Sequence, residues 1–206
     1  MIEQGTPEWF AQRLGKVTAS RVADIMAKTK TGVSASRGNY LAQLVAERLT
    51  GQSADTFKSG AMQHGTETEP QARMAYEAET CQIVTEVAMI THPTIEMSGA
   101  SPDGLVGTDG LVEIKCPNTS THIASLMADK APSQYIPQMQ WQMACTGRAW
   151  CDFVSFAPRM PEDMQLLIKR VPRDDALIAE YEAEVVKFLA EVQETVDKLI
   201  ALRRGA

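Results

Sequence analysis

The stretch SPDGLVGTDGLVEIKCP, from Ser101 to Pro117, decides the fold of this chain. Its second half alternates charged and apolar residues, as a strand with one buried face does. Because side chains alternate between the two faces of a strand, Glu113 and Lys115 share one face and Ile114 points into the core. The stretch therefore predicts a hairpin that presents charge on one side of a sheet.

The turn of this hairpin decides where a third charged residue lies. A three-residue turn at Thr108–Gly110, with Gly110 supplying a positive φ, folds the preceding strand back. In that register Asp103 lies opposite Lys115 and diagonal to Glu113. A two-residue turn would shift the pairing by one and send Asp103 to the other face. We favour the three-residue turn because only it gathers the three charges.

Two carboxylates on one face of a sheet repel each other unless a cation lies between them. Mg²⁺ prefers oxygen ligands and accepts one or two carboxylates together with water and phosphate. The backbone carbonyl of Ile114 is a natural further ligand, and Lys115 is suited to orienting a water and screening phosphate charge. The simpler interpretation is a surface hairpin with an ion pair worth under about 1 kcal/mol. The alternation of Glu113 and Lys115 with valine and isoleucine argues against it, because unpaired charge is expensive in an apolar strand.

Patterns outside the hairpin predict helices on both sides of a group of strands. Thr6 is an N-cap candidate followed by Pro7, and Ser20 is a second N-cap candidate. Gly65 and Pro70 predict a break or kink in the fourth helix. The expected helices cover residues 7–14, 20–28, 39–49, 61–78, 119–127, 133–145 and 174–203, and the expected strands residues 82–91, 97–101, 104–106, 111–115, 150–156 and 166–171. This order predicts an α/β or α+β fold with a central mixed β-sheet flanked by helices.

The composition is that of a globular protein, with 206 residues, 44% apolar and 22% charged. We expect one domain, with a basic helical part over 1–50, a catalytic core over 60–171 and a C-terminal helix over 174–204. The net charge is −6, but residues 1–50 carry +3, so a basic patch remains available to DNA. The N-terminus lacks a signal-peptide pattern and no apolar run suits a membrane span, which predicts a cytoplasmic protein with no membrane partner.

The hairpin and several ordered motifs around it resemble a known family. SPDG with EIKCP resembles the PD-(D/E)XK nuclease signature, and the wider sequence is similar to the lambda exonuclease family of viral recombination exonucleases. The supporting motifs are Arg13-Leu-Gly with Thr18-Ala-Ser20, Gly65-x-x-x-Glu69 with Ala72-Arg73, Gln138-Met-Gln140 and Pro158-Arg-Met160.

This resemblance implies an exonuclease that degrades one strand of linear double-stranded DNA from its 5′ end. The products would be mononucleotides and a 3′ single-stranded tail for recombination. It further implies a homotrimer, a single-strand annealing protein as partner, and Mg²⁺ as cofactor, with Mn²⁺ as an alternative.

The resemblance also assigns roles within the site. The implied catalytic residues are Asp103, Glu113 and the Ile114 carbonyl as metal ligands, Lys115 as the catalytic lysine, Glu69 as an assisting acid and Gln138 as a glutamine lining the site. The implied DNA-binding residues are Arg13, Ser20 and Ser101 around a 5′-phosphate and Lys30 against the duplex. A guanidinium fork and a helix N-terminus both suit a phosphate.

Two other functions remain open on the sequence. One is an endonuclease of the same superfamily, and the other is an inactive DNA-binding or annealing module. Several single residues also have an ordinary structural interpretation. Trp9 is expected in the core, the histidines are expected in solvated or structural positions, and Gln138 and Gln140 would pass for surface residues without the resemblance.

Overall fold

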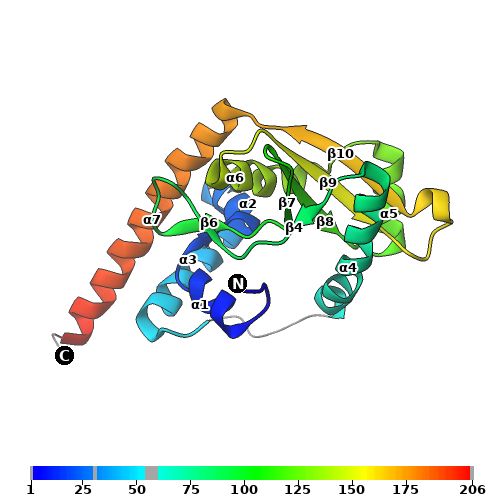
Figure 1. Cartoon of the computed structure of the whole chain (residues 1–206). Helices are drawn as coiled ribbons and strands as arrows, with labels where there is room; N and C mark the ends of the chain where they lie inside the picture. Colours follow the sequence, from blue (N-terminus) through cyan, green and yellow to red (C-terminus); the bar gives the residue numbers. More distant parts are fainter. Residues whose placement is uncertain (1, 30–31, 54–59, 205–206) are drawn as a thin grey trace.

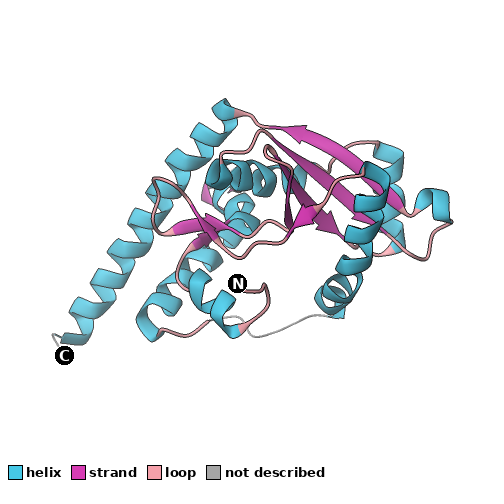
Figure 2. Ribbon diagram, viewed as in Figure 1, coloured by secondary structure: helices cyan, strands magenta, loops and turns pink. Residues whose placement is uncertain are grey.

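A five-stranded mixed sheet forms the centre of the computed structural model, which describes residues 2–29, 32–53 and 60–204 (Figure 1). The strand order is β10-β9-β8-β7-β4, with β8 and β9 parallel and the other neighbours antiparallel. The strands are β4 (Val84–Thr85), β7 (Gly104–Val106), β8 (Gly110–Lys115), β9 (Trp150–Phe156) and β10 (Leu166–Pro172). Helices flank this sheet, so the predicted fold class is confirmed (Figure 2).

Strand alternation divides the core of this sheet between its two faces. Val112, Ile114 and Val154 pack against α4 (Gly60–Thr80). Leu111, Cys151 and Phe153 pack against α6 (Ile136–Thr146) on the other face. Glu113 and Lys115 have the odd numbers of β8, so their side chains leave the sheet on the α6 face.

A second core lies beside the sheet, between the N-terminal helices and the last helix. Its apolar residues come from α2 (Val22–Met26), α3 (Ala35–Thr50), α6 and α7 (Asp175–Arg204). Next to it is a three-stranded sheet in the order β1-β6-β5, made by Val17–Thr18, Ser98–Ala100 and Ile90–Thr91. Because β1 pairs with β6, the chain just before α2 lies beside the segment that leads to Asp103.

The remaining elements are short. They are α1 (Pro7–Arg13), the 3₁₀ turns η1 (Ala19–Arg21), η2 (Ser133–Tyr135) and η3 (Glu162–Met164), the hairpin strands β2 (Lys28–Thr29) and β3 (Gly32–Val33), and α5 (Thr119–Ala128). No helix in the described part of the chain is both long and apolar enough to cross a membrane.

Capping residues explain where the N-terminal helices begin. Thr6 caps α1 by accepting the N–H of Trp9, as predicted. The prediction for α3 was wrong by four residues, because Ser34 caps it by accepting the N–H of Arg37. The prediction for Ser20 was also wrong, because this residue lies inside η1 and caps no helix.

Two other local predictions were wrong. Of the predicted break or kink in α4, the break is wrong: the helix continues through Gly65 and Pro70, and packing of Ala72 and Tyr76 against the sheet supports it. The strand predicted over 82–91 is two short strands, β4 and β5, that belong to different sheets.

Candidate active site

The hairpin between β7 and β8 has a three-residue loop, but this loop lies one residue earlier than predicted. Val106 pairs with Gly110, so the loop is Gly107–Asp109 and the residue with positive φ is Gly107, at +53°. Extending the β7–β8 pairing by one residue beyond Gly104 and Val112 places Asp103 opposite Glu113. The predicted partner of Asp103, Lys115, is therefore wrong. The shift is two residues, so the charged side chains stay on one face.

Packing at Gly110 explains this register. A Cβ atom there would lie 2.1 Å from the ring of Trp150, so only glycine lets the indole lie flat on β8. The guanidinium of Arg148 holds the loop by donating to the carbonyls of Val106, Gly107 and Gly110 at 3.2, 3.0 and 2.6 Å.

The ends of β7 and β8 bring Asp103, Glu113 and Lys115 together. Glu113 is fully buried, and its Oε1 accepts a hydrogen bond from Lys115 Nζ. Burial, reinforced by the negative charge of Glu113, raises the pKa of Asp103 well above its usual range. Burial alone would lower the pKa of Lys115, but the charges of Glu113 and Asp103 raise it. Lys115 therefore stays an ammonium group beside two carboxylates.

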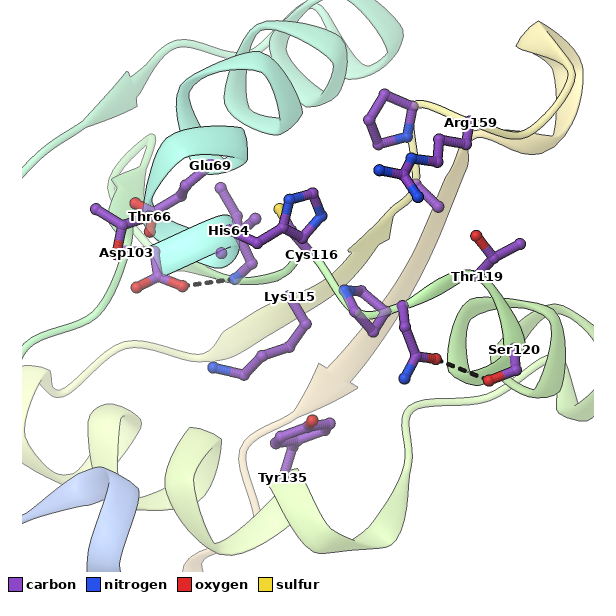
Figure 3. A pocket seen from close by; sticks show the side chains of 16 residues that line it. His64, Thr66, Glu69, Asp103, Lys115, Cys116, Thr119, Ser120, Tyr135 and Arg159 are labelled. Atoms are coloured by element: carbon purple, nitrogen blue, oxygen red, sulfur yellow. Dashed lines mark hydrogen bonds between the residues drawn. The ribbon is translucent and has the colours of Figure 1, made fainter. Parts of the chain in front are cut away.

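The side chain of Asp103 replaces a missing strand contact. Its Oδ2 accepts the backbone N–H of Ile114 at 2.6 Å (Figure 3). In the β7–β8 register Ile114 would face Pro102, which has no N–H to donate to the Ile114 carbonyl. The N–H and C=O of one strand residue point to the same side. The Ile114 carbonyl is therefore directed toward the Asp103 side without a partner from β7.

Two glutamines of α6 contact the buried carboxylate of Glu113. Gln138 Nε2 donates to Oε1 and Gln142 Nε2 donates to Oε2, both at 2.6 Å. Residues four apart lie on one helix face, so both amides reach the same carboxylate. Gln140 lies on another face, where its amide contacts the Pro172 carbonyl and the Asp174 N–H, both at 2.9 Å.

A cleft of about 920 Å³ is lined by Asp103, Ile114 and Lys115 at the ends of β7 and β8. Asp103 and Glu69 lie close together on one side, and Arg159 lies on the opposite wall (Figure 3). Glu69 belongs to α4 and forms an ion pair with Arg73 at 3.0 Å. The cleft lies at the carboxyl ends of the parallel strands β8 and β9, which is where open α/β sheets bind ligands.

Arg13 and Ser101 form a separate polar site near Asp103. Arg13 Nη1 and Trp9 Nε1 both donate to Ser101 Oγ, at 3.1 and 3.0 Å. The Arg13 guanidinium also lies 4.2 Å from the centroid of the Trp9 ring. Burial lowers the pKa of Arg13, and no described carboxylate lies within ion-pair distance of it. A partly buried cation without an ion-pair partner is suited to binding a phosphate.

The other predicted DNA-binding residues are placed differently. Ser20 is exposed and lies 3.5 Å from Thr18 Oγ1, without a hydrogen bond to Arg13 or Ser101 among the described residues. Lys30 lies outside the described residues. Trp9 is half-buried beside Ser101, so its predicted place in the core was wrong. The physical reason is its indole N–H, which finds a polar partner at the surface.

Sequence reasoning missed three residues around the site. Gln142 could have been found from its i+4 spacing to Gln138, since that spacing defines one helix face. Tyr135, whose ring lies 5.3 Å from Lys115 Nζ and stacks on Phe153, gave no signal in the sequence. Arg159 appeared only as part of a motif, and nothing in the sequence placed it in the cleft.

Comparison with known proteins gives a consistent result. The profile of the YqaJ-like viral recombinase domain matches residues 8–149. The alkaline exonuclease LHK-Exo from Laribacter hongkongensis is 57% identical, with 97% of this chain and 99% of that chain covered and a TM-score of 0.91. Its complex with dAMP covers the same shares at the same identity, with a TM-score of 0.92.

A more distant structure shares the fold. A phage-related exonuclease from Haemophilus somnus 129PT is 16% identical, with 91% of this chain and 96% of that chain covered and a TM-score of 0.69. The search of curated proteins gives no match.

Proposed function

The chain belongs to the YqaJ-like viral recombinase family and is a nuclease that acts on DNA, and from this premise we propose that it is a Mg²⁺-dependent exonuclease degrading one strand of linear double-stranded DNA from its 5′ end. Family membership confirms the predicted resemblance to the lambda exonuclease family. The proposal concerns the metal ion, the direction of digestion and the products.

The observation that carries the proposal is the convergence of Asp103 and Glu113 beside Lys115. The raised pKa of Asp103 reflects both burial and the nearby charge of Glu113. Keeping both carboxylates ionised is costly unless a cation lies between them. A purely DNA-binding module has no use for such a pair, because phosphates would be repelled by it.

The donors at this site fit Mg²⁺. No three His, Cys, Asp or Glu side chains of the described residues gather as a metal site, so an ion here needs backbone oxygen, water and phosphate as well. That mixture of ligands is what Mg²⁺ uses at phosphate-processing sites. Asp103, Glu113 and the Ile114 carbonyl, which has no partner from β7, would hold it. When bound, the ion would supply Lewis acidity and lower the pKa of a bound water.

The remaining groups position charge and water. Lys115 carries its ammonium into the cleft, where it would orient the attacking water and stabilise negative charge developing on the phosphate. Gln138 would hold Oε1 of Glu113 in place. Glu69, kept on its side of the cleft by Arg73, is proposed as an assisting acid.

The polar site around Arg13 supports an end-dependent enzyme. The Arg13 fork and the Ser101 hydroxyl would bind a terminal 5′-phosphate, with Ser20 and Lys30 as further proposed DNA contacts. The relative crystallised with dAMP held a mononucleotide, which is the product expected of exonuclease digestion. These two points favour an exonuclease over an endonuclease.

A digestion assay tests the proposal. With Mg²⁺, linear duplex with a 5′ label on one strand and a blocked 5′ end on the other is expected to release labelled mononucleotide and leave the blocked strand intact. Covalently closed circular duplex should survive, and both EDTA and Glu113→Gln should abolish release. Cutting of the circle would indicate an endonuclease, and release from the 3′ end would reverse the proposed polarity.

The assembly and the biological role are also proposed on family grounds. We propose a homotrimer that works with a single-strand annealing protein in recombination, with Mn²⁺ able to replace Mg²⁺. Sedimentation analysis of the purified chain tests the trimer, and a monomer that digests processively would contradict it.

A further inference from the structure

Glu113 receives one amide hydrogen bond on each of its two oxygens, both from α6. Gln138 is half-buried and donates to Oε1, the oxygen that also accepts from Lys115 at the cleft. Gln142 is fully buried and donates to Oε2. The two glutamines are therefore not equivalent, because Gln142 is too deep to contact DNA.

The contacts of Gln142 fix which end of its amide faces Glu113. Its Oε1 lies 3.8 Å from Cys151 Sγ on β9. Burial raises the pKa of the Cys151 thiol well above its usual range, so the sulfur keeps its proton and can donate it. The amide oxygen is thus held toward Cys151 and the amide nitrogen toward Glu113. The reverse orientation of the Gln142 amide would place its oxygen against the Glu113 carboxylate, and the two would repel each other.

The Gln142 amide is neutral, so its effect on Glu113 differs from that of a cationic side chain. It satisfies the buried Oε2 atom, which would otherwise cost free energy, and adds no second positive charge to that of Lys115 on Oε1. The carboxylate plane is then fixed from behind, with Oε1 directed toward the Lys115 side. Groups that orient a metal ligand in this way commonly change metal affinity when they are removed.

We propose that Gln142 is a positioning residue. It fixes Oε2 of Glu113 and thereby sets the affinity of the site for a divalent cation. This inference rests on the proposed function, since it takes Glu113 as a metal ligand. It adds to that function a residue that touches neither DNA nor the reacting atoms.

Metal binding without DNA tests the inference, with Gln142→Met as the variant and Gln140→Met as its matched control. Both substitutions remove a buried amide from α6 and keep the side-chain length, but only Gln142 contacts Glu113. Mn²⁺ is titrated into each protein and free Mn²⁺ is followed by its EPR signal. Gln142→Met should weaken Mn²⁺ binding by about 10- to 100-fold, and Gln140→Met should leave it within about twofold of wild type.

The Mg²⁺ dependence of digestion gives a second readout. For Gln142→Met the half-saturating Mg²⁺ concentration should rise by a similar factor, with much of the rate recovered at high Mg²⁺. If Gln142→Met does not fold, Gln142→Asn replaces it, because this variant keeps an amide that is too short to reach Oε2. Thermal melts of all variants show whether they are folded.

The outcomes separate this inference from the proposed function. Wild-type affinity in the Gln142 variant, or equal weakening in Gln140→Met, would overturn the role of Gln142 while leaving the nuclease proposal intact. A wild-type protein that neither binds Mn²⁺ nor needs a divalent ion for digestion would overturn both.

Discussion

Asp103 Oδ2 accepts the backbone N–H of Ile114 at 2.6 Å, and this bond joins the end of β7 to the end of β8. The bond stands where Pro102 would otherwise continue the strand pairing. It places the half-buried carboxyl group of Asp103 next to the fully buried Glu113. The same relationship therefore builds the proposed metal site and destabilises the protein in the absence of metal.

The first prediction follows from this destabilisation of the metal-free protein. The pKa of Asp103 is raised above the value of about 3.9 for an unfolded chain, so its ionisation disfavours the folded state. The cost is absent below about pH 3.9 and grows as the pH rises toward the raised folded-state pKa. Asp103→Asn keeps an acceptor for Ile114 and should melt a few degrees (about 2–6 °C) higher than wild type in EDTA near pH 8.

Two controls belong to this measurement by differential scanning calorimetry. The advantage of Asp103→Asn should shrink as the pH falls toward about 4. Millimolar Mg²⁺ should raise the melting temperature of wild type more than that of the variant, because only wild type gains full binding energy. A variant that melts lower than wild type in EDTA at pH 8 would contradict the prediction.

The second prediction concerns Lys115. Lys115→Met keeps most of the side-chain volume and removes the ammonium, so the rate of digestion under saturating Mg²⁺ should fall by about 10²- to 10⁴-fold. Lys169→Met is the matched control, because its side chain is 30% exposed against 27% for Lys115 and pairs with Asp129 at 2.5 Å. Lys169→Met should digest at nearly the wild-type rate. Equal rates for Lys115→Met and wild type would remove Lys115 from the mechanism.

The third prediction concerns the 5′ end of the substrate. Arg13→Ala should slow digestion of 5′-phosphorylated duplex by at least about tenfold, since charge-assisted bonds of roughly 1.5–3 kcal/mol are lost. Digestion of 5′-hydroxyl duplex should change much less. The measured quantity is the ratio of the two rates under single-turnover conditions.

Another arginine, Arg37, controls for nonspecific loss of positive charge in the third prediction. Arg37 donates both guanidinium ends to Glu191, at 2.7 and 2.8 Å, so Arg37→Ala should leave the ratio unchanged. If Arg13→Ala slows both substrates equally, the 5′-phosphate site is not at Arg13.

The fourth prediction tests the register of the hairpin. Gly110→Ala places a Cβ 2.1 Å from the Trp150 ring and should lower the free energy of unfolding by about 1–3 kcal/mol in urea titrations. Gly38→Ala is the opposite case, because Gly38 lies in α3 with no atom within 4 Å of the added Cβ. It should raise stability by up to about 1 kcal/mol. A neutral Gly110→Ala would contradict the observed packing.

The sequence alone predicted which charged side chains share one face of the sheet. Alternation in β8 was enough to place Glu113 and Lys115 on one face and Ile114 in the core, because side-chain direction in a strand follows from parity. The helices predicted over 133–145 and 174–203 correspond closely to α6 and α7, and the capping pair Thr6–Pro7 predicted α1. Family motifs added Glu69, Gln138 and the Arg13–Ser101 pair.

Register was the first feature that only the tertiary structure decided. The hairpin loop is Gly107–Asp109 and not 108–110, because the Trp150 ring needs Gly110 inside the strand. That contact joins residues 40 positions apart, and no local pattern records it. Likewise α4 passes through Pro70 because contacts with the sheet outweigh the local preference for a break.

The surroundings of the charged residues also came from the tertiary structure. The sequence drew attention to Gln138 and Gln140, but only packing shows that Gln142 reaches Glu113 and that Gln140 turns away to Pro172. The alternation of residues along a strand and their spacing along a helix are properties of one element, so the sequence of that element is enough to predict them. The partner of a buried side chain depends on which elements pack together, and that was decided by the fold.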